Sequence, residues 1–67
     1  MPYESFKRKI LEYMEKAGIS KTVFFDHDTD KRQYTAWVPG EELRFTCSES
    51  GLNMAVKFRS HTYPIPT

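Results

Sequence analysis

The stretch FFDHDTDKRQYTAWV, residues 24–38, decides between two kinds of fold. Aspartates occupy three alternate positions in it: Asp26, Asp28 and Asp30. This spacing opens an EF-hand calcium loop, but such a loop also requires glycine at its sixth position and glutamate at its twelfth. Those two positions hold Lys31 and Trp37. Runs rich in aromatic and β-branched residues flank the aspartates, which predicts a β-hairpin with aspartates at its turn and no metal site.

The segment before this stretch has the periodicity of a helix. Its apolar residues recur at spacings of three and four: Tyr3, Phe6, Ile10, Met14 and Ala17. This spacing places them on one face of a helix spanning about residues 3–17. Gly18 suits the left-handed position that follows a helix, and Ile19 can make the apolar contact that accompanies such an ending.

After Gly18 the apolar period changes to two. We expect four strands, at about residues 21–27, 32–38, 42–47 and 52–59, separated by the turn signals DTDK, PGE and SESG. Tight turns at these places give three opposed pairs: Phe25–Tyr34, Ala36–Leu43 and Phe45–Met54. Directly opposed residues share a face, and a one-residue slip would mix the two faces.

These registers give one consistently apolar face. It would carry Val23, Phe25, Tyr34, Ala36, Leu43, Phe45, Cys47, Leu52, Met54, Val56 and Phe58. The predicted fold is therefore α+β: an N-terminal helix packed on the apolar face of a four-stranded antiparallel β-meander, in the order 1-2-3-4. Residues 1–67 would form a single small domain, with residues 60–67 as a tail.

Composition indicates an ordinary small globular protein. The chain has 67 residues, of which 39% are hydrophobic and 28% charged, so one modest core is expected. Lys and Arg number 10 against 9 Asp and Glu, a formal net charge of +1, which argues against a general nucleic-acid binder. The lone Cys47 favours a reducing compartment. Because the N-terminal segment has no long apolar run, we expect no signal peptide and no membrane association, and a cytoplasmic location.

The residue types that carry catalysis or bind metals are sparse. The only histidines and cysteine are His27, Cys47 and His61, and they lack the close-spaced pair typical of zinc sites. Cys47 falls on the apolar face, where a thiol is a small buried group rather than a nucleophile. We find no carboxylate pair or phosphate-binding glycine loop, so we expect a non-enzyme without cofactor.

The other face of the predicted sheet is the candidate binding surface. It would hold two large aromatics, Phe24 and Trp37, placed diagonally, with Thr35, Arg44 and Lys57 around them. Exposed aromatic and arginine side chains are typical anchors of protein interfaces. The alternative is that the tail folds back and covers Trp37 with Tyr63 and Ile65.

Two functions are compatible with this surface. The first is a small regulator or inhibitor that binds another protein, with a size and layout that resemble those of small phage and plasmid regulators. The alternative is a nucleic-acid-binding module that uses Lys57 with these basic residues: Lys7, Arg8, Lys9 and Arg59. Asp26 and Glu42 share the open face with the cations, and this mixed charge favours a protein partner. A homodimer through an edge strand or the open face is also compatible with the pattern.

Overall fold

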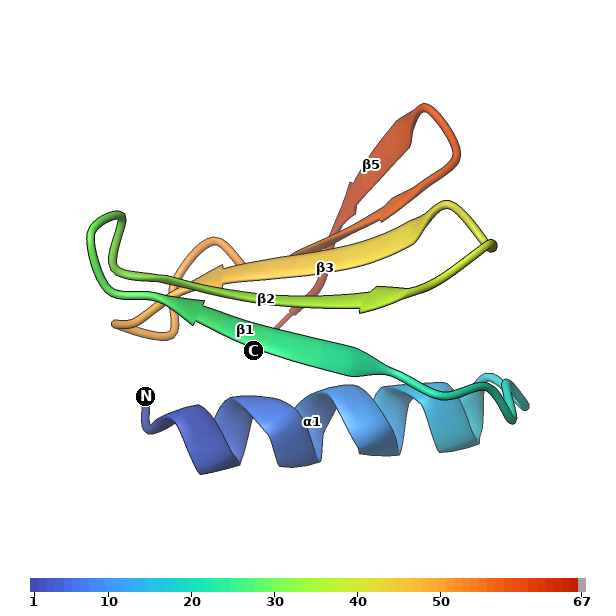
Figure 1. Cartoon of the computed structure of the whole chain (residues 1–67), viewed down its shortest axis with the longest axis horizontal. Coiled ribbons are helices and arrows are strands. Elements are labelled where there is room, and N and C mark those ends of the chain that lie inside the picture. Colours follow the sequence, from blue (N-terminus) through green and yellow to red (C-terminus); the bar gives the residue numbers. More distant parts are fainter. Residues whose placement is uncertain (67) are drawn as a thin grey trace.

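The chain adopts an α+β fold with one helix and one five-stranded antiparallel sheet in residues 1–66, which are the residues that the computed structural model describes. Helix α1 (Tyr3–Lys16) is followed by β1 (Phe24–Asp28), β2 (Gln33–Val38), β3 (Leu43–Ser48), β4 (Ala55–Phe58) and β5 (His61–Pro64). The strands lie in the order β1-β2-β3-β4-β5, and α1 runs along one face of the sheet (Figure 1). We call the opposite face the open face.

Helix α1 forms and ends as its sequence predicts. The residues it buries, Phe6, Ile10 and Met14, are spaced by four and therefore lie on one face. Gly18 takes a left-handed φ of 72°. There its N–H donates to Glu15 O at 3.1 Å, and the Ile19 N–H donates to Met14 O at 2.9 Å. These two bonds form a Schellman motif, which satisfies carbonyls that the end of a helix leaves without partners.

The strand registers differ from the predicted ones by two residues in each of the first three pairings. The opposed pairs are Phe25–Ala36, Ala36–Phe45 and Phe45–Val56. Two-residue turns of the mirror types need positive φ at their central residues, which Thr29-Asp30 does not favour and which proline excludes at Pro39. The first two connections are instead four residues long, and each ends on a left-handed residue: Arg32 (φ 52°) and Glu42 (φ 53°). Because a shift of two residues keeps every paired side chain on its face, the predicted faces survive for the residues within these strands.

The predicted strand over residues 52–59 is too long. Strand β4 begins only at Ala55, because Asn53 has a φ of 57° and interrupts the extended backbone. The Leu52 N–H bonds to the Ser48 hydroxyl at 3.1 Å, which closes a loop between β3 and β4. Leu52 is 64% exposed, so its predicted place on the apolar face is wrong. The first predicted strand, residues 21–27, likewise begins later, at Phe24.

The prediction of four strands followed by a tail at residues 60–67 is one strand short, because the sheet has five strands. Residues 61–64 form β5, which pairs antiparallel with β4 and places Val56 opposite Tyr63. The turn between the two strands, Arg59-Ser60, is short, and Arg59 has a φ of 58°. Pro64 disfavours a strand in the sequence, but β5 is an edge strand, where proline is tolerated because its missing N–H need not face a neighbour.

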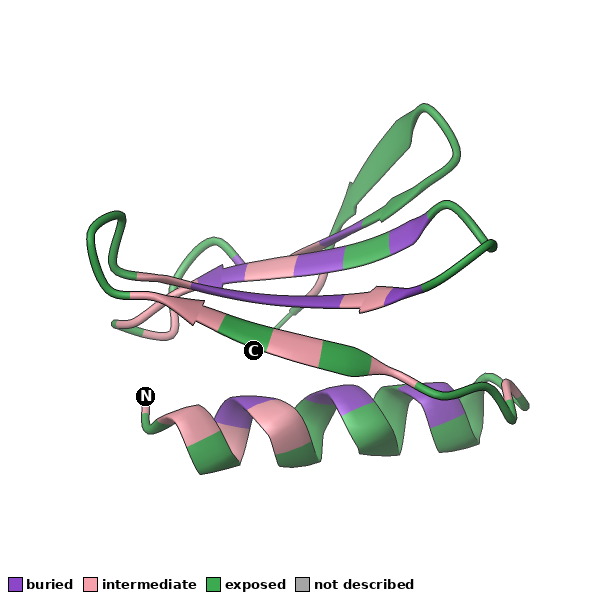
Figure 2. Cartoon of the chain, viewed as in Figure 1, coloured by how far each residue is buried: buried purple, intermediate pink, exposed green. Residues whose placement is uncertain are grey.

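The core lies between α1 and the middle of the sheet. Figure 2 shows buried residues along β2 and β3 and on the side of α1 that faces the sheet, whereas β5 is exposed throughout. The buried set is Phe6, Ile10, Met14, Tyr34, Ala36, Val38, Leu43, Phe45, Cys47, Met54 and Val56. Phe45 is fully buried, with the ring of Tyr13 edge-on at 5.3 Å. Phe58, predicted to belong to this core, lies on the helix-facing side of the sheet but remains 41% exposed.

The dimensions of α1 also bear on membrane association. It has 14 residues, and within residues 1–66 no helix has the length and apolar character that crossing a bilayer requires.

Candidate binding surface on the open face

One row of side chains crosses all five strands on the open face. The sheet registers place its members directly opposite one another, in the order Phe24, Trp37, Arg44, Lys57 and Thr62. Four of the five side chains predicted to bind a partner therefore lie in a single line. We call this line the open-face row; it is aromatic at the β1 end and cationic in the middle.

The aromatic end of the row is a stacked pair. The rings of Phe24 and Trp37 lie 6.1 Å apart between centroids, at an interplanar angle of 25°. The predicted arrangement was diagonal, and the register shift of two residues converts it into direct opposition. The Arg44 guanidinium lies 5.7 Å from the centre of the Trp37 ring, within the range of a cation–π interaction. The three side chains therefore lie side by side on the open face.

The C-terminal segment does not cover this stack. Tyr63 opposes Val56, so it lies on the helix-facing side of the sheet. Ile65 packs against the hydrophobic core, and its N–H donates to Met54 O at 2.8 Å. Both side chains that were candidates to cover Trp37 thus belong to the other face, and Phe24 remains 49% exposed.

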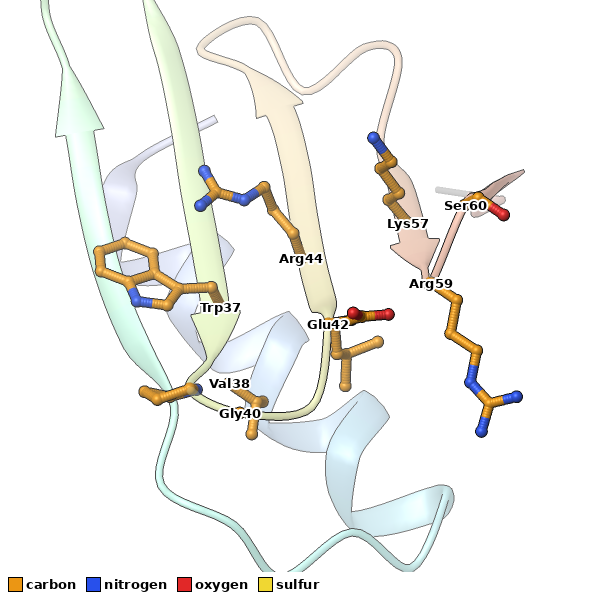
Figure 3. Close-up of a pocket in the computed structure, with 10 residues that line it drawn as sticks. Trp37, Val38, Gly40, Glu42, Arg44, Lys57, Arg59 and Ser60 are labelled. Atoms are coloured by element: carbon orange, nitrogen blue, oxygen red, sulfur yellow. The ribbon is translucent and has the colours of Figure 1, made fainter.

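A groove of about 670 Å³ begins at Trp37 and runs toward the β4–β5 turn (Figure 3). Its lining comprises Trp37, Val38, Pro39, Gly40, Glu42, Leu43, Arg44, Lys57, Arg59 and Ser60. Three of these side chains are cationic and one is anionic. Figure 3 shows Arg44 and Lys57 projecting from neighbouring strands, whereas Arg59 extends from the turn away from both, with its guanidinium 5.1 Å from the centre of the Phe58 ring. The groove is therefore a cationic depression with an indole at one end.

The two cations at the centre of the groove oppose each other without a neutralising carboxylate. Arg44 on β3 is directly opposite Lys57 on β4. Within residues 1–66 the ion pairs join other residues: Lys7 with Glu4, Lys21 with Glu41, and His27 with Glu49. Like charges directly opposed across strands destabilise a sheet, so this pair is unfavourable for folding.

The neighbouring row on the open face is small and polar. It runs from Asp26 through Thr35, Thr46 and Ala55 to Pro64. Thr35 was predicted to contact a partner, but its side chain is only 9% exposed. It can therefore offer little surface, whereas Asp26 is exposed beside the aromatic pair.

The basic residues of the helix lie apart from the groove. Lys7, Arg8 and Lys9 belong to α1, which covers the opposite face of the sheet. Lys7 is engaged within the helix, since its ammonium lies 3.0 Å from the Glu4 carboxylate and 4.7 Å from the centre of the Tyr3 ring. Of the cations proposed for nucleic-acid binding, only Lys57 and Arg59 therefore line the groove.

The residues that could bind a metal or act as a nucleophile have roles in the fold. The Asp28 carboxylate accepts a hydrogen bond from the Lys31 N–H at 3.0 Å, the turn role that Asp favours. Burial raises the pKa of the Cys47 thiol, which disfavours the reactive thiolate. No cluster of three His, Cys, Asp or Glu side chains that could hold a metal ion occurs in residues 1–66.

A polar cluster around His27 was not predicted from the sequence. The His27 imidazole pairs with the Glu49 carboxylate, and the rings of Tyr3 and Tyr34 lie 5.4 Å and 4.7 Å from the His27 ring. The Glu49 N–H also bonds to Arg32 O at 3.0 Å, so the cluster ties the β3–β4 loop to the first hairpin. No local signal marks a contact between positions 27 and 49, because it depends on the order of the strands.

Comparison with family models, with curated proteins and with solved structures finds no match to this chain.

Proposed function

We propose that this chain is a small, non-catalytic protein-binding module, a regulator or inhibitor that docks a partner protein through its open sheet face. The observation that carries the proposal is the accessible stack of Phe24 on Trp37, braced by Arg44 at the head of the groove. Phe24 is 49% exposed and Trp37 half-buried beside it, and an exposed apolar patch of this kind marks many sites of protein interaction.

The energetics of protein recognition support this surface. Binding hot spots are enriched in Trp, Tyr and Arg, because such side chains bury a large area with few rotatable bonds. Trp37 and Arg44 are already held against each other in the free chain. This contact limits the conformational entropy that the two side chains lose when a partner immobilises them. A smaller entropy loss favours tighter binding for a given buried area.

Nucleic-acid binding is the second candidate, and one specific observation favours it. Aromatic side chains beside cations on a sheet face are the usual platform for single-stranded nucleic acid, and the open-face row has that sequence of groups. The carboxylates on the same face weigh against it, since Glu42 lines the groove and Asp26 lies beside the stack. The formal net charge of +1 also favours a protein partner.

A matched pair of apolar variants tests the proposal. Phe24→Ala removes half of the stack, whereas Leu11→Ala removes a similarly exposed apolar side chain, at 53% against 49%, from α1. Each variant and the wild type would be used for affinity capture from cells of the source organism, with and without nuclease. We expect partner proteins that survive nuclease treatment and are retained by Leu11→Ala but lost by Phe24→Ala.

Two results would contradict the proposal. Equal retention by both variants would place the binding surface elsewhere on the chain. Loss of all captured material after nuclease treatment would favour the nucleic-acid alternative, and binding would then weaken steeply as salt is raised.

A further inference from the structure

We infer that the groove running from Trp37 to Arg59 receives an extended acidic segment of the partner protein, with at least two carboxylates beside an apolar or aromatic side chain. This inference rests on the proposed function and names the chemistry of the partner. It depends on three features of the groove: its unneutralised cations, their spacing, and the indole at one end.

The first feature is the opposed pair of cations. Arg44 and Lys57 face each other across β3 and β4, and the ion pairs within residues 1–66 involve neither of them. The chain has nearly as many acidic as basic residues, so a general excess of positive charge does not account for the arrangement. An incoming carboxylate between the two side chains would turn their mutual repulsion into attraction.

The second feature is the spacing of the cations. Neighbouring strands lie about 4.8 Å apart, and two residues along a strand span about 6.6 Å. Arg44 and Lys57 are one strand apart on the open face, whereas Arg59 has a left-handed φ of 58° and its guanidinium lies 5.1 Å from the centre of the Phe58 ring, directed away from that pair. Side chains at alternate positions of an extended peptide also repeat at about 6.6 Å. Because the side chains of Arg44 and Lys57 are long and flexible, two carboxylates on one side of such a peptide would meet both cations together.

The third feature is the arrangement at the Trp37 end. The Arg44 guanidinium lies against the indole, and a stacked guanidinium keeps its N–H edge free for a carboxylate. The exposed ring of Phe24 continues the apolar surface on β1. An acidic residue of the partner at Arg44 would thus bring its apolar neighbours onto Trp37 and Phe24.

The distribution of carboxylates separates a peptide from a nucleic acid. A phosphate backbone carries a charge at every nucleotide and needs a continuous cationic track. Here Glu42 interrupts the groove, and Asp26 lies on the strand that carries Phe24. A peptide can place its carboxylates only where the cations are and leave neutral or basic residues beside Glu42.

The test uses a displayed library of random short peptides, selected on the wild-type full chain. We expect the selected peptides to contain at least two Asp or Glu residues near an aromatic residue. Matched peptides with Asn and Gln in place of those acids should bind at least about tenfold more weakly. A single-stranded oligothymidylate serves as the nucleic-acid probe.

Two double variants supply the matched control on the protein side. Arg44→Gln with Lys57→Gln empties the groove of two cations, whereas Arg8→Gln with Lys9→Gln removes one arginine and one lysine, both exposed, from α1. We expect the groove variant to lose at least about tenfold in affinity for the acidic peptides and the helix variant to lose none, apart from a small change shared with any loss of net charge.

The outcomes separate this inference from the proposed function. Selected peptides that lack acidic residues but lose affinity for the Trp37→Ala variant would overturn the inference and leave the proposed function standing. Peptides that never depend on Trp37 would contradict both. Equal losses in the two double variants, or binding of the oligothymidylate that is tighter than peptide binding and lost in the groove variant, would also overturn the acidic segment.

Discussion

Two adjacent rows of the same sheet have opposite characters. On the helix-facing side, Phe25, Ala36, Phe45, Val56 and Tyr63 oppose one another across the five strands, and α1 covers the middle of that row. One residue along each strand lies the open-face row, from Phe24 to Thr62, which nothing in residues 1–66 covers. Both rows arise because successive side chains of a strand point to opposite faces. Only the helix-facing row is partly covered by another element of the chain, which is α1. One set of strands therefore carries the core on one face and, on the other, the surface that we propose for a partner.

The largest expected effect concerns the covered row. Phe45→Ala deletes a fully buried ring from a central strand and should lower the free energy of unfolding by about 3–5 kcal/mol. For a domain this small, that loss approaches the whole stability. Chemical denaturation followed by circular dichroism would measure it. A loss below about 1 kcal/mol would mean that the contrast between the two rows is false.

The next effect concerns the open-face row. Trp37→Ala should weaken partner binding by about 2 kcal/mol or more, as truncation of an anchor does, while lowering the free energy of unfolding by only about 1–2 kcal/mol, because the indole is half-buried. Calorimetric titration with the captured partner, together with denaturation of the free variant, would measure both quantities. A stability loss as large as that of Phe45→Ala would show that the indole is a core residue.

The separation of the two faces predicts additivity. Deletion of residues 61–67 removes β5 and should destabilise the protein, since Ile65 packs on the core. Because Tyr63 and Ile65 lie on the face opposite Trp37, the losses from the deletion and from Trp37→Ala should add within about 0.5 kcal/mol. Denaturation of the two single variants and the combined one would test this. A combined loss smaller than the sum would indicate that the C-terminal segment contacts the indole.

A smaller effect comes from the opposed cations. Lys57→Gln removes one of two like charges on facing strands, so it should leave stability unchanged or raise it by about 0.2–1 kcal/mol at low salt. The gain should shrink as salt is added. Lys9→Gln on α1 is the matched control and should show no such salt-dependent gain. Thermal unfolding at two salt concentrations would detect the difference; a clear loss of stability in Lys57→Gln would contradict the repulsion.

The smallest expected effect is that of calcium. Asp28 is engaged with the Lys31 N–H in the turn, and the positions that an EF-hand loop needs hold Lys31 and Trp37. Sub-millimolar calcium should therefore leave the midpoint of thermal unfolding unchanged. A rise of several degrees that chelation reverses would mean that the first hairpin binds the ion.

The residues by themselves determined the helix, its ending at Gly18 and the assignment of side chains to the two faces. These features depend on periodicity and on local backbone preferences, which a single segment carries. The faces survived a register error in three pairings because each error was two residues, an even number. The same property kept four of the candidate partner-binding residues together on one side of the sheet, although the predicted pairs were wrong.

The tertiary structure alone decided the lengths of the turns, the fifth strand and the surroundings of Trp37. Four residues with left-handed backbone set where strands begin and end: Arg32, Glu42, Asn53 and Arg59. Glycine in a sequence indicates such a conformation, but these residue types do not. The pairing of β5 with β4 put Tyr63 and Ile65 on the helix-facing side, so that neither side chain covers the indole of Trp37. The pairing of the two strands also places Arg59 in the β4–β5 turn, where it lines the same groove as Arg44 of β3. Contacts between segments distant in the chain have no local signature, because their energy exists only once the strands are ordered side by side.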